Sequence, residues 1–309
     1  MKHKIVRSTV LLVLLGSILT GALYLYGEEK EEATTLSDSS SREKQQLDKT
    51  EQTDEKTESN DLTGEIKEAF SNVLEGARGL FLKEDLDIVT IGDSLTQGVG
   101  DQTNNEGYVG IMRDTLQENE NNVDVNVKNY GKRGNRTDQM LKRLEEKKIK
   151  SSIEKADLVL ITIGANDIMK IVKDNFTKLN YKSFVQEQKA YKERLRSIFT
   201  TIREQNPEAK IYLIGLYNPF KEYFSDVPEL GQIVDDWNNI GRQVVQEYDN
   251  TGYIPILDAF ERATQSIYAE DNFHPNQFGY KIMAQRVLDY IKEDIEKIEE
   301  EKQEKVEST

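Results

Sequence analysis

The sequence contains no cysteine and only two histidines, His3 and His274. The absence of cysteine excludes disulfide bonds, thiolate metal sites, a lipid-modified cysteine and a cysteine nucleophile. Two histidines are too few for a histidine-rich zinc centre, and the motifs described below provide no cluster of metal ligands, so we expect no metal site. We expect no cofactor either. Any reaction in the body of the protein that needs an imidazole must use His274.

The sequence has fewer basic than acidic residues. Lys and Arg total 41 against 56 Asp and Glu, which gives the 309-residue chain a formal net charge of −15. Proteins that bind nucleic acid usually present a basic face, so we expect no nucleic-acid partner. With 37% hydrophobic and 31% charged residues, the chain is too polar to fold as one uniform globule of this length. It must contain segments of different character.

Residues 1–27 have the character of a membrane anchor. Three basic residues among the first seven precede a run of 20 uncharged residues, 8–27. A helix of about 20 residues crosses a hydrocarbon core, whereas the apolar part of a cleaved signal has about 7 to 15. We predict a single-pass anchor in the cell membrane, with the rest of the chain outside. The alternative is a cleaved signal and a secreted protein, because Thr20 and Ala22 are small residues suitably spaced for a cut.

Three further segments flank the body of the protein. Residues 28–61 hold 12 acidic and 5 basic side chains and few apolar ones, which predicts an extended, disordered linker. Residues 62–83 repeat apolar side chains at helical spacing, which predicts an amphipathic helix. Residues 296–309 are almost wholly charged, and we expect a C-terminal tail in which the helical pattern frays.

Residues 84–295 have a suitable length for one α/β domain. Apolar runs typical of buried strands alternate with helical patterns, which predicts a parallel sheet covered on both faces. The expected strands are Asp87–Ile91, Val123–Asn129, Leu158–Ile163, Ile211–Leu216 and Tyr253–Leu257. The expected helices are Tyr108–Glu118, Asp138–Lys147, Lys182–Glu204 and Glu229–Tyr248. Ligands bind such sheets at the carboxyl ends of the strands, so we expect the site there.

Three strands end in short polar motifs. The first runs into Gly-Asp-Ser, which places Ser94 in the first turn after the strand. The second ends in a glycine-rich turn containing Gly134, where a backbone N–H can approach a bound oxygen closely. The third delivers Asn166, an uncharged amide donor suited to an oxyanion. Taken singly, the Gly-Asp-Ser motif is more often a helix cap, the glycine-rich segment a tight turn, and the isolated asparagine an Asx turn.

The last predicted strand is followed by the motif Asp-Asn-Phe-His-Pro. Asp271 lies three residues before His274, so one turn can bring its carboxylate to Nδ1 and leave Nε2 free to take a hydroxyl proton. Pro275 suits the first position of the helix that follows, which would place His274 at the helix cap. Together the motifs offer a nucleophile, oxyanion donors, an orienting acid and a general base.

The motifs GDSLTQG, NYGKRGNRT, IGANDI and DNFHPNQFG resemble those of the GDSL or SGNH hydrolase family, particularly its lysophospholipase/thioesterase-like bacterial members. The resemblance covers roughly residues 87–291 and implies a flavodoxin-like three-layer α/β/α fold, with five parallel strands in the order 2-1-3-4-5. It also implies hydrolysis of acyl esters through a serine acyl-enzyme. The roles it implies are Ser94 as nucleophile, His274 as base and then acid, Asp271 as its orienter, and an oxyanion hole of the Ser94 N–H, the Gly134 N–H and the Asn166 side chain.

Lys132 and Arg133 depart from the family pattern, in which many members have small residues before the oxyanion glycine. They are either part of an ordinary solvated turn or contacts to an anionic substrate, such as a phospholipid head group or a phosphate-bearing wall polymer. Apolar residues after the third and fourth strands are candidates both for an acyl pocket and for the core: Ile168, Met169, Tyr217, Phe220, Tyr223 and Phe224.

Three functions stay open at this point. The first is an extracytoplasmic serine esterase or lipase that acts on acyl esters of lipids. The second keeps the chemistry but removes O-acetyl groups from peptidoglycan or another wall glycan, within reach of a domain on a long polar linker. The third, of a different class, is a surface binding module without turnover. The complete set of Ser94, His274 and Asp271 argues against this third function. Acyl chain-length preference separates the first two.

Overall fold

The computed structural model describes residues 85–118, 125–175, 180–220 and 228–307, and the structural statements below concern these residues. The predicted anchor, linker and amphipathic helix at residues 1–27, 28–61 and 62–83 lie outside them. In the described part of the chain, no helix is both long enough and apolar enough to cross a membrane.

Five strands form one parallel sheet in the order β2-β1-β3-β4-β5. The strands are β1 (Leu86–Gly92), β2 (Val125–Gly131), β3 (Leu158–Thr162), β4 (Lys210–Ile214) and β5 (Thr251–Ile254). The predicted α/β fold and its strand order are confirmed. Consecutive residues such as Ile88 and Val89 of β1 point to opposite faces, and both are buried. Helices therefore cover both faces, which explains why the strands read as unbroken apolar runs.

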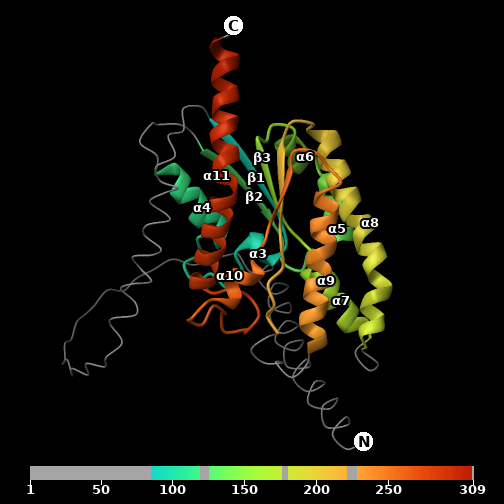
Figure 1. Ribbon diagram of the computed structural model, residues 1–309. Helices are drawn as coiled ribbons and strands as arrows, with labels where there is room; N and C mark the ends of the chain where they lie inside the picture. Colours follow the sequence, from blue (N-terminus) through green and yellow to red (C-terminus); the bar gives the residue numbers. More distant parts are fainter. Residues whose placement is uncertain (1–84, 119–124, 176–179, 221–227, 308–309) are drawn as a thin grey trace, which may run out of the picture. The chain divides into compact units, whose positions relative to one another are not determined.

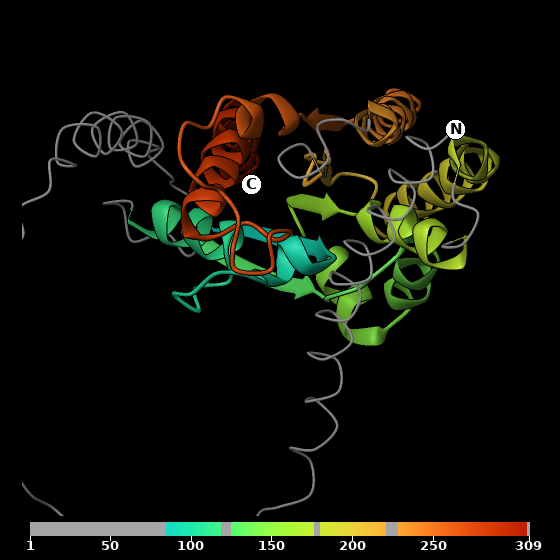
Figure 2. The ribbon, with the colours of Figure 1, turned by 90° about the horizontal axis from the view of Figure 1, so that it is seen from below.

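Two groups of helices enclose the sheet, giving three layers (Figure 1). One face carries α4 (Tyr108–Gln117), α10 (Leu257–Glu261) and α11 (Gln277–Glu307). The opposite face carries α5 (Thr137–Leu144), α6 (Lys147–Ile153), α7 (Ala165–Asp174), α8 (Tyr181–Gln205) and α9 (Pro228–Val245). The short helix α3 (Ser94–Gln97) follows β1 directly, at the carboxyl edge of the sheet, which Figure 2 views from below. The main core lies under α4 and α11, where Ile88, Leu160 and Ile214 pack.

Helix α11 continues to Glu307, past the domain boundary expected at residue 295. Its apolar stripe, which includes Val287 and Ile291, packs into the core. Beyond that stripe, Lys302 Nζ donates to the carbonyl of Asp85 at 2.6 Å and to Asp157 Oδ2 at 2.7 Å. The charged segment after residue 295 is therefore helical up to Glu307 and is bound to the amino ends of β1 and β3.

Several sequence predictions about elements were wrong in detail. The predicted strand Tyr253–Leu257 ends at Ile254, because Pro255 has no N–H to continue the ladder, and Leu257 begins α10. The predicted helix Asp138–Lys147 is split, with α5 ending at Leu144 and α6 beginning at Lys147. The segment after β3, for which no helix was predicted, is helix α7.

Strand β2 runs two residues beyond its predicted end and finishes at Gly131. A Cβ atom at this position would lie 2.1 Å from the backbone nitrogen of Gln97, the last residue of α3. Only glycine therefore lets α3 pack against the end of β2. This contact fixes the helix that begins with Ser94 at the carboxyl edge of the sheet.

Candidate active site

Helix α3 begins at Ser94 and is capped by Asp93. The Asp93 Oδ1 atom accepts hydrogen bonds from the Leu95 N–H at 3.0 Å and the Thr162 hydroxyl at 3.1 Å. Asp93 is only 1% exposed. Burial raises the pKa of its carboxyl to about 6, although these two hydrogen bonds act in the opposite direction. Within the described residues, Asp93 Oδ2 has no hydrogen-bond partner. The helix-cap interpretation thus holds for Asp93 and leaves the neighbouring Ser94 at the pocket.

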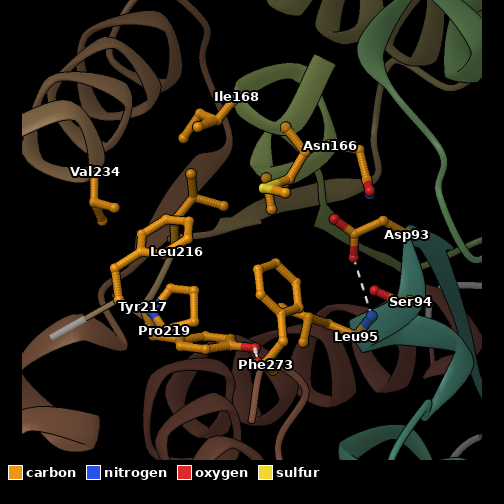
Figure 3. A pocket seen from close by; sticks show the side chains of 13 residues that line it. Asp93, Ser94, Leu95, Asn166, Ile168, Leu216, Tyr217, Pro219, Val234 and Phe273 are labelled. Carbon is orange, nitrogen blue, oxygen red and sulfur yellow. Dashed lines mark hydrogen bonds between the residues drawn. The ribbon is translucent and has the colours of Figure 1, made fainter. Parts of the chain in front are cut away.

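A pocket of about 500 Å³, including its part open to solvent, lies beside Ser94 (Figure 3). Asp93, Ser94 and Asn166 lie on one side of it, and apolar side chains surround the remainder. The lining residues are Asp93, Ser94, Leu95, Ala165, Asn166, Ile168, Met169, Leu216, Tyr217, Pro219, Phe220, Val234 and Phe273. The carboxyl ends of β1, β3 and β4 all contribute to this wall, as expected for a parallel sheet.

Four of the six apolar candidates named from the sequence line this pocket: Ile168, Met169, Tyr217 and Phe220. Tyr223 and Phe224 lie outside the described residues. Sequence reasoning missed Val234 of α9 and Phe273, which precedes His274. Phe273 could have been found from its place inside the histidine motif, whereas nothing in the sequence of α9 distinguishes Val234 from a core residue.

Asp271 and His274 form a hydrogen-bonded pair, with 2.5 Å between Asp271 Oδ2 and His274 Nδ1. The other oxygen, Oδ1, accepts from the backbone N–H of Phe273 at 3.0 Å and of His274 at 2.9 Å. Asn272 completes the turn with φ +53°, a left-handed conformation that asparagine tolerates. Burial alone would raise the pKa of Asp271, but the hydrogen bonds with His274 and the two amides lower it to about 2.

The charge of Asp271 decides which nitrogen of His274 carries a proton. With a pKa of about 2, the carboxyl is ionised at neutral pH and accepts a hydrogen bond from Nδ1–H. Nε2 of the neutral ring is then left as an acceptor. The Tyr217 hydroxyl donates to the Phe273 carbonyl at 2.5 Å, and both of these rings line the pocket. The His274 segment is thereby held beside the pocket that Ser94 lines.

The cap of α11 is Asn276. Its Oδ1 atom accepts from the Gly279 N–H at 3.0 Å, and its carbonyl accepts from the Tyr280 N–H at 2.9 Å. The prediction that Pro275 begins this helix and His274 caps it was wrong. The His274 imidazole is hydrogen-bonded to Asp271. Asn276 is the next residue whose side chain can accept a backbone N–H, and it caps the helix.

Gly134 lies in the turn after β2 with φ +74°, and no heavy atom lies within 4 Å of the point where a Cβ would be. The backbone conformation, rather than lack of space, therefore favours glycine here. The Lys132 N–H donates to the Gly92 carbonyl at 3.0 Å, and the Asn135 N–H donates to the Lys132 carbonyl at 3.1 Å. The turn is thus bound to the end of β1, while the Lys132 and Arg133 side chains are exposed.

Asn166 lies in the first turn of α7, and its Nδ2 donates to the Asn135 carbonyl at 3.1 Å. An amide nitrogen carries two hydrogens, so this bond leaves the second one for a ligand in the pocket. The bond also joins α7 to the turn that contains Gly134. The structure therefore brings Ser94 and Asn166 to one pocket, pairs Asp271 with His274, and places the Gly134 turn against Asn166.

A further set of hydrogen bonds joins the same two segments and was missed from the sequence. Thr137 donates to Asp167 twice, from its N–H to Oδ2 at 3.1 Å and from its hydroxyl to Oδ1 at 2.5 Å. Arg194 of α8 donates from Nε to the Thr137 hydroxyl at 2.7 Å and from Nη2 to Asp167 Oδ1 at 3.3 Å. Burial raises the pKa of the Asp167 carboxyl, against the effect of Thr137 and Arg194.

Residues 90–282 match the GDSL-like lipase/acylhydrolase family. The protein YpmR of Bacillus subtilis strain 168, described as uncharacterized, is 39% identical over 214 residues, which cover 69% of this chain and 84% of YpmR. The spore germination lipase LipC of Bacillus licheniformis is 26% identical over 211 residues, covering 65% of this chain and 94% of LipC.

Solved structures share the fold. The lipase Lip_vut3 from a goat rumen metagenome has a TM-score of 0.56 at 24% identity, covering 65% of this chain and 95% of that one. A variant of Axe2, an acetyl-xylooligosaccharide esterase from Geobacillus stearothermophilus, has a TM-score of 0.54 at 24% identity, covering 69% and 96%.

Proposed function

This chain belongs to the GDSL-like lipase/acylhydrolase family and is a carboxylic ester hydrolase, and we propose that Ser94, His274 and Asp271 carry out its reaction. The arrangement that supports this is the hydrogen-bonded pair of the buried His274 and the partly exposed Asp271, beside a pocket that Ser94 lines. A lowered carboxyl pKa next to the imidazole is what an orienting acid requires, because the carboxylate must stay ionised while the imidazolium forms.

The reaction would proceed in two halves. The Ser94 Oγ attacks the ester carbonyl carbon while His274 Nε2 takes its proton, and the resulting imidazolium is stabilised by Asp271. The oxyanion would accept hydrogen bonds from the N–H groups of Ser94 and Gly134 and from the second Nδ2 hydrogen of Asn166. His274 then returns the proton to the departing alcohol, which leaves an acyl-enzyme. Water, deprotonated by His274, attacks this acyl group, and the acid leaves as the proton returns to Ser94.

The apolar lining of the pocket favours a hydrocarbon acyl chain as the group bound next to Ser94. Leu216, Tyr217 and Phe220 form an apolar wall against which a hydrocarbon chain can pack. Burying a methylene group contributes about 0.8 kcal/mol, so kcat/KM should rise roughly fourfold with each methylene until the pocket is full. The proposed substrates are therefore acyl esters of lipids, and removal of O-acetyl groups from a wall glycan is the competing outcome of the test.

The proposed location is the outer side of the cell membrane. The support comes from the sequence, in which three basic residues precede the uncharged run 8–27 and an acidic linker, 28–61, follows. A location outside the cytoplasm would give the hydrolase access to membrane lipids and wall polymers. Fractionation of cells that express the full chain tests this. Recovery of the protein in the cytosolic fraction would contradict the proposal.

The test of function is hydrolysis of p-nitrophenyl acetate, butyrate, octanoate and palmitate by the full chain, beside Ser94→Ala and His274→Ala. Ser197→Ala is the matched control, because Ser197 is an exposed serine of α8. We expect activity to be lost in the two site variants, retained in the control, and highest on a medium or long chain. Activity on acetate alone would favour the acetyl esterase. Equal activity of wild type and Ser94→Ala would refute the proposed mechanism.

A further inference from the structure

The two candidate oxyanion donors outside α3 come from separate segments of the chain. Gly134 belongs to the turn between β2 and α5, and Asn166 belongs to the first turn of α7. An oxyanion hole works only when its donors are held at hydrogen-bond distance from one developing charge before the reaction begins. Some contact must therefore set the position of the Gly134 turn against α7.

The structure shows two links between these segments, on consecutive residues of α7. Asn166 bonds to the Asn135 carbonyl, and Asp167 accepts both donors of Thr137. The turn is also bound to the end of β1, and the two links to α7 fix its orientation and its distance relative to that helix. The partners lie 31 and 30 residues apart in sequence, so the links hold segments that local structure does not.

Charge and burial make the second link strong. Thr137 is the first residue of α5, so its N–H has no partner within its own helix and Asp167 supplies one. The carboxylate also lies at the positive end of the α5 dipole. Asp167 and Thr137 are buried, and hydrogen bonds to an ionised group are stronger than those between neutral groups. Arg194 bonds to both residues from α8 and balances the buried charge.

We propose that Asp167, Thr137 and Arg194 act as a positioning cluster that sets the geometry of the Gly134 and Asn166 oxyanion donors. The cluster touches neither substrate nor the reacting atoms, and it acts through the two donors. The inference rests on the proposed function, because it assumes that these donors stabilise an oxyanion formed on Ser94. Loosening the cluster should therefore weaken binding of the transition state and leave binding of the ester nearly unchanged.

The test uses the full chain with two disruptive variants and two matched ones. Thr137→Val removes the hydroxyl but keeps the shape, and Thr137→Ser restores the hydroxyl. Arg194→Met removes the guanidinium from a partly exposed position. Arg196→Met is its control, since Arg196 lies on the same helix but pairs with Glu247 instead. For each variant, kcat and KM on p-nitrophenyl butyrate are measured with the melting temperature and the inhibition constant of butylboronic acid, which forms a tetrahedral anion on a serine.

We expect kcat to fall about 10- to 100-fold in Thr137→Val and Arg194→Met, with KM nearly constant. The affinity for butylboronic acid should fall in parallel with kcat. Thr137→Ser should recover most of both, and Arg196→Met should match wild type. A role confined to stability would instead lower the melting temperature and leave kcat of the folded protein unchanged.

The inference is overturned if folded variants keep kcat and boronate affinity within about twofold of wild type. If Thr137→Val does not fold, Arg194→Met decides the question alone, because its side chain is partly solvent-exposed. Failure of the proposed function gives a different result. In that case Ser94→Ala itself stays active, whatever the cluster variants do.

Discussion

The histidine side and the proposed oxyanion side of this site are built in opposite ways. Asp271 and His274 are three residues apart, and the bonds that orient the ring lie within one turn. The oxyanion side joins Thr137 to Asp167 and Arg194, at separations of 30 and 57 residues. The Asp271–His274 arrangement forms once a single turn of the chain has folded. The contacts of Thr137 with Asp167 and Arg194 form only after β2, β3 and α8 have docked. The geometry of the proposed oxyanion hole thus depends on tertiary packing far more than that of the Asp271–His274 pair does.

The largest effect should come from breaking the local pair with Asp271→Asn. The amide can still accept the backbone N–H bonds of the turn, but it offers no negative charge to the imidazolium and permits the wrong tautomer. We expect kcat to fall about 10³- to 10⁴-fold with little change in melting temperature. Asp174→Asn, which removes an exposed ion-pair partner of Lys170, is the control. A loss of less than about tenfold would mean that another group orients His274.

The next largest effect should come from Asn166→Ala on the oxyanion side. This change removes a candidate donor and one of the two links to the Gly134 turn, so we expect kcat to fall about 10²- to 10³-fold at nearly constant KM. Asn175→Ala is the control, because Asn175 caps the other end of the same helix. An increase in KM with unchanged kcat would show that Asn166 binds the ester rather than the oxyanion.

The buried cap of the Ser94 helix should make stability depend on pH. The Asp93 carboxyl has a pKa of about 6 in the folded protein, against 3.8 for an aspartate in water. Between these values the unfolded chain gives up its proton before the folded one does, so the free energy of unfolding falls as pH rises. The loss should reach about 3 kcal/mol above pH 6. Urea unfolding between pH 4 and 8 measures it. Asp93→Asn should flatten the curve, and parallel curves for the two proteins would contradict the assignment.

The smallest effect concerns the turn that carries Gly134. Lys132→Gln with Arg133→Gln should raise KM for anionic esters about fivefold more than for neutral ones, because exposed ion pairs contribute up to about 1 kcal/mol. The control is Lys182→Gln with Lys189→Gln, which changes the net charge equally on the exposed side of α8. Equal effects on both kinds of ester would assign Lys132 and Arg133 to an ordinary solvated turn.

The sequence revealed the fold and the local half of the site for the same reason. Strand periodicity and the Asp271-x-x-His274 spacing are short-range signals, and both could be interpreted without tertiary information. The helical conformation of α7 was not predicted, because asparagine and aspartate, here Asn166 and Asp167, are common in turns. The apolar residues of this segment were interpreted as pocket or core candidates instead of as one face of a helix. The partnership of Asp167 with Thr137 and Arg194 could not be predicted, since no local pattern shows which helices will meet.

Tyr217 connects the occupant of the pocket to the position of His274, the proposed base. Its ring lines the acyl pocket, its hydroxyl bonds to the carbonyl of Phe273, and His274 is the next residue. In the proposed reaction, an acyl chain that displaces this ring would also move the peptide that carries His274. Discrimination between chain lengths can therefore appear in turnover as well as in affinity, so that a badly fitting ester binds and yet reacts slowly.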